Sequence, residues 1–233
     1  MKLVEMIANR AGFGNILAEG SERAAQILDC GREFLITSKS QEAPAHMPPV
    51  KRGLGLIYAA NPYGADHQSF EHDPAYESDH EFFKDRLALL GLDKPEESLS
   101  LGPEKIRFVK TTQQFYSLMD SLCLCQFACG PACQLYGPAE IVKVVQAVTG
   151  WDISIDELLL IGERRLNMMK AFNVRGGFTR DTIHYPRSFL AEPSRAVRRP
   201  VSNWIKRPME ALYPSTAARL AGMRIRVFLN ARR

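Results

Sequence analysis

The stretch that organises this sequence is EKIRFVKTTQQFYSLMDSL (residues 104–122), which runs directly into Cys123-Leu124-Cys125. Within it, Ile106, Val109, Phe115 or Tyr116, and Met119 recur with the spacing of one helix face. This spacing predicts a long helix that buries one side. Because the helix ends where the cysteines begin, it is expected to hold them in a fixed place.

Outward from this stretch, the sequence predicts helices over residues 1–9, 16–28, 54–60, 78–90, 138–148 and 154–172. Ser154 and Glu157 have the spacing of a capping box, Pro138 suits a first helical turn, and Gly176-Gly177 ends the last helix. No convincing alternating strand and no internal repeat is present. The predicted fold class is therefore mainly α.

The length and composition of the chain are those of a protein with a hydrophobic core. It has 233 residues, of which 45% are hydrophobic and 24% are charged, and this excludes disorder as a description of the whole chain. There is no run of about eighteen apolar residues, and Glu5 stands where a signal peptide would be apolar. We therefore expect a soluble, cytoplasmic protein with no membrane partner.

The charge of the chain is divided unevenly along its length. Residues 1–193 carry 20 Lys and Arg against 25 Asp and Glu, whereas residues 194–233 carry 10 against 1. A mildly acidic body with a basic tail does not indicate a nucleic-acid-binding domain. The tail is consistent with a divergent terminus, a frameshifted reading or an arm for an acidic partner.

Four of the five cysteines, Cys123, Cys125, Cys129 and Cys133, lie within eleven residues. An odd number of cysteines without an export signal makes a disulfide framework improbable. Their spacing differs from the Cys-x2-Cys of ferredoxins and zinc ribbons. Two hypotheses stay open: a self-contained zinc or iron–sulfur site, or small buried residues, the latter favoured for Cys129 and Cys133. Cys125, beside Asp120 at the predicted helix end, is the stronger candidate for a metal ligand.

Residues 41–74 contain five prolines and three histidines, and this stretch is predicted to form ordered loops around the short helix. His67 follows the turn-forming run Asn61–Asp66, which would hold its imidazole in place. Histidine suits proton transfer near neutral pH, so His67 and then His46 are candidate catalytic residues, with a hydrogen-bonded structural role as the alternative. For His72, His80 and His184 we favour a surface or structural role.

Several segments resemble the C-terminal part of the tungsten-containing aldehyde ferredoxin oxidoreductase family, in the family's order across about residues 3–193. They are Gly12–Gly20, Pro44–His46, Gly53–Ala59, Gly64–His67, Asp120–Cys125 with Phe127, Thr149–Asp152, Ile161–Arg164 and Phe172–Arg180.

The resemblance implies largely helical domains that bind a tungsten, sometimes molybdenum, bis-pterin cofactor beside a [4Fe–4S] cluster. Such enzymes oxidise small aldehydes or related oxo compounds and pass electrons to ferredoxin. The family's Asp-x-x-Gly-Leu-Cys motif falls on Asp120–Cys125, so Asp120 and the Leu124 backbone would hold the pterin and Cys125 would be the fourth cluster ligand. His67 matches the family's histidine near the metal, and His46 falls where some relatives carry Tyr.

The sequence also departs from the family. Cys123 replaces the motif's glycine, where the backbone should approach the pterin closely. The family's cysteine trio, first pterin motif and N-terminal β domain would precede Met1, so we expect a separate N-terminal portion as partner, with an inactive truncated remnant as the alternative. The expected domains are residues 1–77, ending the second helical domain with ordered loops over 41–77, then a C-terminal helical domain over 78–193, and the basic tail over 194–233.

Overall fold

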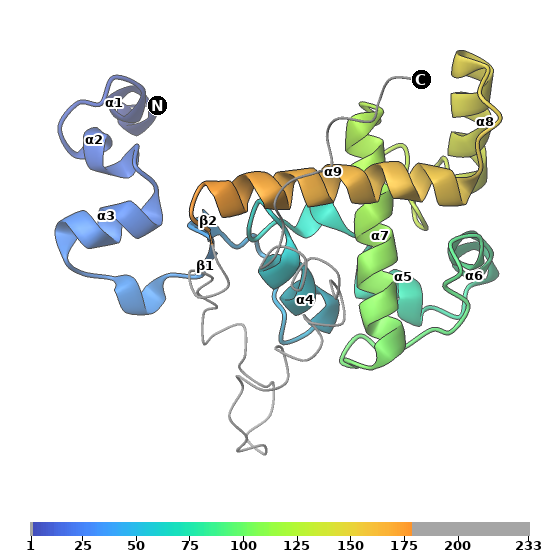
Figure 1. Ribbon diagram of the computed structural model, residues 1–233. Coiled ribbons are helices and arrows are strands. Elements are labelled where there is room, and N and C mark those ends of the chain that lie inside the picture. Colours follow the sequence, from blue (N-terminus) through green and yellow to red (C-terminus); the bar gives the residue numbers. More distant parts are fainter. Residues whose placement is uncertain (1, 179–233) are drawn as a thin grey trace.

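The computed structural model describes residues 2–178 and is shown in Figure 1. Residues 179–233, with His184 and the basic tail, lie outside the described part of the chain. The elements in chain order are α1 (Lys2–Ala8), α2 (Phe13–Leu17), α3 (Ser21–Leu28), η1 (Arg32–Phe34), β1 (Thr37–Ser38), β2 (Gln41–Glu42), α4 (Arg52–Ala60), η2 (His67–Ser69), α5 (Asp73–Glu77), α6 (Glu81–Ala88), α7 (Pro103–Ser121), α8 (Pro138–Thr149) and α9 (Ile155–Arg175).

The prediction of a mainly α fold is confirmed, because the strands described within residues 2–178 are two residues long and form one antiparallel hairpin. The predicted helix ends also hold. Pro138 opens α8, Ser154 caps α9 and accepts a hydrogen bond from the Glu157 amide, and Gly176 ends α9. No helix among these residues is both long and apolar enough to cross a membrane.

One helix prediction is wrong. The helix predicted over residues 16–28 is two helices, α2 and α3, separated by Gly20. Gly20 has a φ of 83°, a left-handed conformation that breaks the helical path. The apolar periodicity continues across Gly20, so the periodicity alone did not predict that the helix is interrupted there.

The core is organised by α7, which α9 crosses (Figure 1). The two helices approach so closely at Gly162 that a Cβ there would lie 1.9 Å from the Gln114 carbonyl oxygen. The Ser117 hydroxyl donates to the Gly162 carbonyl across the contact, at 3.0 Å. Gly162 therefore permits the crossing because it has no side chain.

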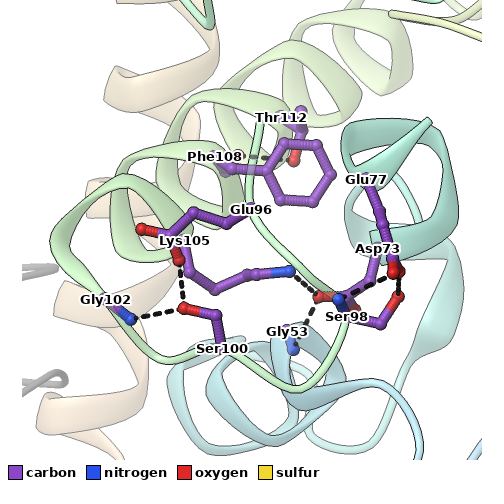
Figure 2. Close-up of polar contacts among 10 residues, drawn as sticks. All are labelled: Gly53, Asp73, Glu77, Glu96, Ser98, Ser100, Gly102, Lys105, Phe108 and Thr112. Atoms are coloured by element: carbon purple, nitrogen blue, oxygen red, sulfur yellow. Dashed lines mark hydrogen bonds and ion pairs between the residues drawn. The ribbon is translucent and has the colours of Figure 1, made fainter. Parts of the chain in front are cut away.

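The N-terminal end of α7 is fixed by a buried ion pair, drawn in Figure 2. Lys105 Nζ lies 2.6 Å from Asp73 Oδ1, and both side chains are fully buried. The same Asp73 oxygen accepts the amide of Gly53, at 3.1 Å, in the first turn of α4. One carboxylate thus ties together α4, α5 and α7, and α4 and α5 flank the segment that carries His67 and His72.

A single hydrophobic cluster joins α4, the loops after it, α6, α7, α8 and α9. It therefore crosses residue 77, the predicted domain boundary. In contrast, α1, α2 and α3 stand to one side of this body (Figure 1), and α1 has no buried residue.

Candidate functional site

The end of α7 is a left-handed helix stop formed by Cys123. The Cys123 amide donates to the Asp120 carbonyl at 3.2 Å, and the Leu124 amide donates to the Met119 carbonyl at 3.0 Å. These two bonds define a Schellman motif, in which the turning residue is usually glycine. Cys123 turns the chain with a φ of 56°. The position therefore requires a left-handed backbone, which explains physically why glycine is favoured there.

This turn sets the directions of the residues that follow it. The Leu124 side chain packs against the hydrophobic core. Its amide is engaged by the helix stop, so its carbonyl is the backbone group left for a ligand. Cys125 comes next and is exposed, and its own carbonyl accepts the amides of Ala128 and Cys129.

Asp120 is held by contacts from two other segments. Its Oδ2 lies 3.0 Å from Arg165 Nη1 of α9, and its Oδ1 accepts a bond of 3.4 Å from the Gln126 side chain. The side chain keeps 42% of its surface exposed. Asp120 thus presents a carboxylate that is oriented but still open to solvent.

Three histidines from the loops around α4 gather at one place. The ring of His46 stacks on that of His67, with centroids 4.4 Å apart, and His72 lies edge-on to both at 5.0 and 5.9 Å. The Tyr58 hydroxyl donates to the His46 carbonyl, and Lys51 Nζ lies 3.2 Å from His72 Nδ1. The structure therefore brings together the two predicted histidines, and it adds His72, for which the sequence favoured only a surface or structural role.

The surroundings favour neutral imidazoles at His67 and His72. Burial, followed by the neighbouring His46, lowers the pKa of His67. Burial and the Lys51 ammonium lower the pKa of His72 to about 4. Desolvation and nearby positive charge both disfavour the protonated ring. At neutral pH, His67 is thus a group that accepts a proton rather than one that holds it.

A pocket of about 230 Å³ lies between the His67 turn and the C-terminal half of α7. Its walls come from the Asn61–Ser69 segment, from α7 and from α9. Asp120 lines it, and so do Asp66 and Ser69 on either side of His67, although His67 itself does not. The lining residues are Asn61, Tyr63, Asp66, Ser69, Gln113, Tyr116, Ser117, Asp120, Arg165, Leu166 and Met169.

The four clustered cysteines do not share one environment. Cys129 is buried, as predicted, whereas Cys123, Cys125 and Cys133 are exposed, so the prediction of a buried residue is wrong for Cys133. Within residues 2–178, no three His, Cys, Asp or Glu side chains are grouped so that they could hold a metal ion. The hypothesis of a self-contained metal module is therefore not supported.

Arg165 is the site residue that sequence reasoning missed. It stands in α9, one turn after Gly162, and reaches both Asp120 and the Ser117 hydroxyl. Its position beside Glu163-Arg164 gives no local signal that separates it from the exposed Arg164. Only the crossing of α9 over α7 shows which arginine faces the pocket.

Comparison with known proteins confirms the resemblance. The sequence model of a family described as aldehyde ferredoxin oxidoreductase, domains 2 and 3, matches residues 1–213. The tungsten-containing aldehyde ferredoxin oxidoreductases of Pyrococcus horikoshii, Pyrococcus abyssi and Pyrococcus furiosus are each 32% identical to the chain over 194 residues. These matches cover 82% of this chain but 29% of each relative.

A solved structure shares the fold. The active site complex BamBC of benzoyl coenzyme A reductase, in complex with 1,5-dienoyl-CoA, matches with a TM-score of 0.67 and 20% identity. The match covers 92% of this chain and 35% of that one. The chain thus spans about a third of the length of the proteins that it matches.

Proposed function

Because the chain belongs to the aldehyde ferredoxin oxidoreductase family, we propose that it forms the C-terminal portion of a tungsten or molybdenum bis-pterin oxidoreductase. The complete enzyme would oxidise small aldehydes or related oxo compounds in the cytoplasm and pass the electrons to ferredoxin. A separate N-terminal portion would complete the site.

The observation that carries this proposal is the shared pocket at the end of α7. Asp120, from the pterin motif, and Asp66 and Ser69, which flank the candidate catalytic His67, line the same space although they are more than fifty residues apart in the chain. Cys125 lies exposed five residues after Asp120. Asp120 and the turn that carries His67 thus line one pocket, and the exposed thiol of Cys125 follows in the chain just after α7.

The residues present fit the cofactor's needs in part. The Asp120 carboxylate, open to the pocket, would accept N–H groups of a pterin, and the Leu124 carbonyl would give a backbone contact. The Cys125 thiol would be one cluster ligand, because thiolates hold iron–sulfur clusters. When bound, the metal and its pterins would supply the two-electron redox chemistry, and the cluster would carry electrons onward.

His67 would accept the proton that is released at this site. Its lowered pKa keeps the imidazole neutral, so it can take up the proton that oxidation of a hydrated aldehyde releases. His46 stacks on the ring and limits its rotation, and Gln68 contacts its Nε2 at 3.0 Å. The ring is therefore oriented by packing and by one polar contact.

The site is incomplete in the described part of this chain. The Cys125 thiol alone cannot hold a cluster that needs four ligands, so the remaining three would come from the cysteine trio of the N-terminal portion. Large apolar side chains also face outward, including Phe34 at 79%, Phe127 at 87% and Phe172 at 76% exposure. Exposed apolar groups of this size fit surfaces that another part of the enzyme covers.

The test is co-expression with a polypeptide that carries Cys-x2-Cys-x3-Cys, followed by metal analysis of the purified complex. We expect tungsten or molybdenum and about four iron atoms per complex, and Cys125→Ser should reduce the iron. Cys30→Ser is the matched control, because Cys30 is also exposed but stands far along the chain from the motif. A complex that forms without metal would contradict the proposal.

The alternative is an inactive, truncated form of the enzyme. It is favoured by Cys123, a residue with a side chain at the left-handed position of the pterin motif. This form would keep the fold but bind neither metal nor pterin when the N-terminal portion is supplied, so the same metal analysis separates the two functions.

A further inference from the structure

The contact between α7 and α9 places a cation next to the candidate pterin aspartate. Gly162 lets α9 pass directly over the Gln114 carbonyl, and Arg165 follows one helical turn later. At that distance along α9 its side chain reaches the last turn of α7. The closeness of the crossing therefore brings an arginine of α9 to Asp120, whose carboxylate also stays open to solvent.

Arg165 is itself held in place. Its Nη1 lies 3.2 Å from the Ser117 hydroxyl and 3.0 Å from Asp120 Oδ2. The Ser117 hydroxyl in turn donates to the Gly162 carbonyl. The guanidinium thus bridges two residues of α7 that lie one turn apart, and this limits the rotamers open to both the arginine and the aspartate.

The exposure of this pair shows that its main effect is not on stability. Arg165 keeps 32% and Asp120 keeps 42% of the side-chain surface exposed. Ion pairs with this access to solvent contribute little to folding free energy. The geometry, however, fixes one carboxylate oxygen and leaves acceptor capacity on Asp120 facing the pocket.

We propose that Arg165 is a positioning residue, which holds the Asp120 carboxylate at the wall of the pocket so that it accepts N–H groups of the pterin. This inference rests on the proposed function. It deepens that function by giving one residue of α9 a defined role in a pocket whose other walls come from α7 and the Asn61–Ser69 segment. Gln126, which contacts the other carboxylate oxygen, assists from the loop after Cys125.

The first test uses the full chain without any cofactor. Hydrogen exchange is measured for the amides of Leu122, Cys123 and Leu124, which close the end of α7. Arg165→Met should speed their exchange about fivefold to tenfold, because Asp120 loses its anchor. Arg164→Met, on the exposed neighbour, should leave exchange unchanged, and Arg165→Lys should restore part of the protection. Unchanged exchange in Arg165→Met would overturn the positioning role.

The second test measures what the complex with the N-terminal portion retains. Released pterin is measured by fluorescence and tungsten by mass spectrometry. The Arg165→Met complex should retain about a tenth of the wild-type pterin, Arg165→Lys an intermediate amount, and Arg164→Met the full amount. All variants should melt within about 3 °C of wild type.

The outcomes distinguish a failure of the role proposed for Arg165 from a failure of the proposed function. A wild-type complex that holds pterin together with an equally loaded Arg165→Met complex overturns the role of Arg165 alone. A wild-type complex without pterin overturns the proposed function, and the pterin-directed role of Arg165 falls with it.

Discussion

The two ends of α7 carry the same kind of interaction in opposite settings. At its start, Lys105 pairs with Asp73 at 2.6 Å, with both side chains fully buried (Figure 2). At its end, Asp120 pairs with Arg165 at 3.0 Å, with both side chains partly exposed. The first pair is part of the core, and the second lies on the wall of a pocket.

The difference shows how burial determines what an ion pair does. Burial raises the pKa of Asp73, and Lys105 and the Gly53 amide oppose that rise, so this carboxylate depends on its partners. Such a pair fixes structure because neither member can be left alone in the core. The Asp120 pair keeps its hydration, so its carboxylate stays available to a ligand.

Of the variants that test this contrast between a buried and a partly exposed ion pair, Lys105→Met should have the largest effect on stability. Removing the ammonium leaves Asp73 buried without a counter-ion, and we expect a loss of about 3–5 kcal/mol in unfolding free energy. Urea unfolding measures it, and adding Asp73→Asn should recover part of the loss. The control is Arg107→Met on the same helix, whose partly exposed pair with Glu104, at 3.8 Å, should contribute less than about 1 kcal/mol. Equal effects for the two variants would contradict the comparison.

Gly162→Ala tests the other end, because it forces α9 away from α7. The new Cβ would meet the Gln114 carbonyl oxygen, and backbone cannot move aside as a flexible side chain can. We expect a loss of about 2–3 kcal/mol in unfolding free energy from overpacking, together with faster hydrogen exchange at the end of α7. Arg164→Ala, in the same helix but exposed, should change neither quantity. An unchanged unfolding free energy for Gly162→Ala would show that α7 and α9 do not approach each other this closely at Gly162.

The histidine cluster should make the unfolding free energy of the chain depend on pH. The pKa of His72 is about 4 in the folded chain against 6.5 for an unperturbed histidine, so the unfolded chain binds the proton first as pH falls. Stability should therefore be lost from about pH 6.5 down to about pH 4.

The lowered pKa of His67 acts in the same direction. Since His72 is only partly buried, solvent reduces its effect to about 1–2 kcal/mol over that window. Urea unfolding between pH 4 and pH 7 measures the slope, which His72→Gln should flatten. A wild-type slope of the opposite sign would rule out this reading.

The smallest expected effect is that of Cys123→Gly. The left-handed backbone costs a side-chain-bearing residue about 1–2 kcal/mol, while glycine loses about 0.5–1 kcal/mol of chain entropy on folding. The net gain should be about 0.5–1 kcal/mol in thermal or urea unfolding. Cys133→Gly is the control, because Cys133 is not among the residues with positive φ and should only lose stability. A destabilised Cys123→Gly chain would mean that the thiol makes a contact of its own.

Much of the fold could be predicted from local sequence. The limits of α8 and α9 followed from Pro138, the Ser154–Glu157 capping box and Gly176, because these signals act within one helical turn. The break at Gly20 could not be predicted in the same way, since an isolated glycine is tolerated inside many helices. The site was predictable only as separate pieces, namely the Asp120–Cys125 motif, His46 and His67.

By itself, then, the sequence determined that the fold is mainly α and which family the chain belongs to, and it named the candidate site residues. Tertiary structure alone decided that His72 joins His46 and His67, that Asp66 shares a pocket with Asp120, and that Arg165 rather than Arg164 faces it. The physical reason is distance along the chain. Helix caps and apolar periodicity act between near neighbours, whereas these contacts join segments far apart in the chain, and the Arg165 contact depends on the close approach of α9 to α7 at Gly162.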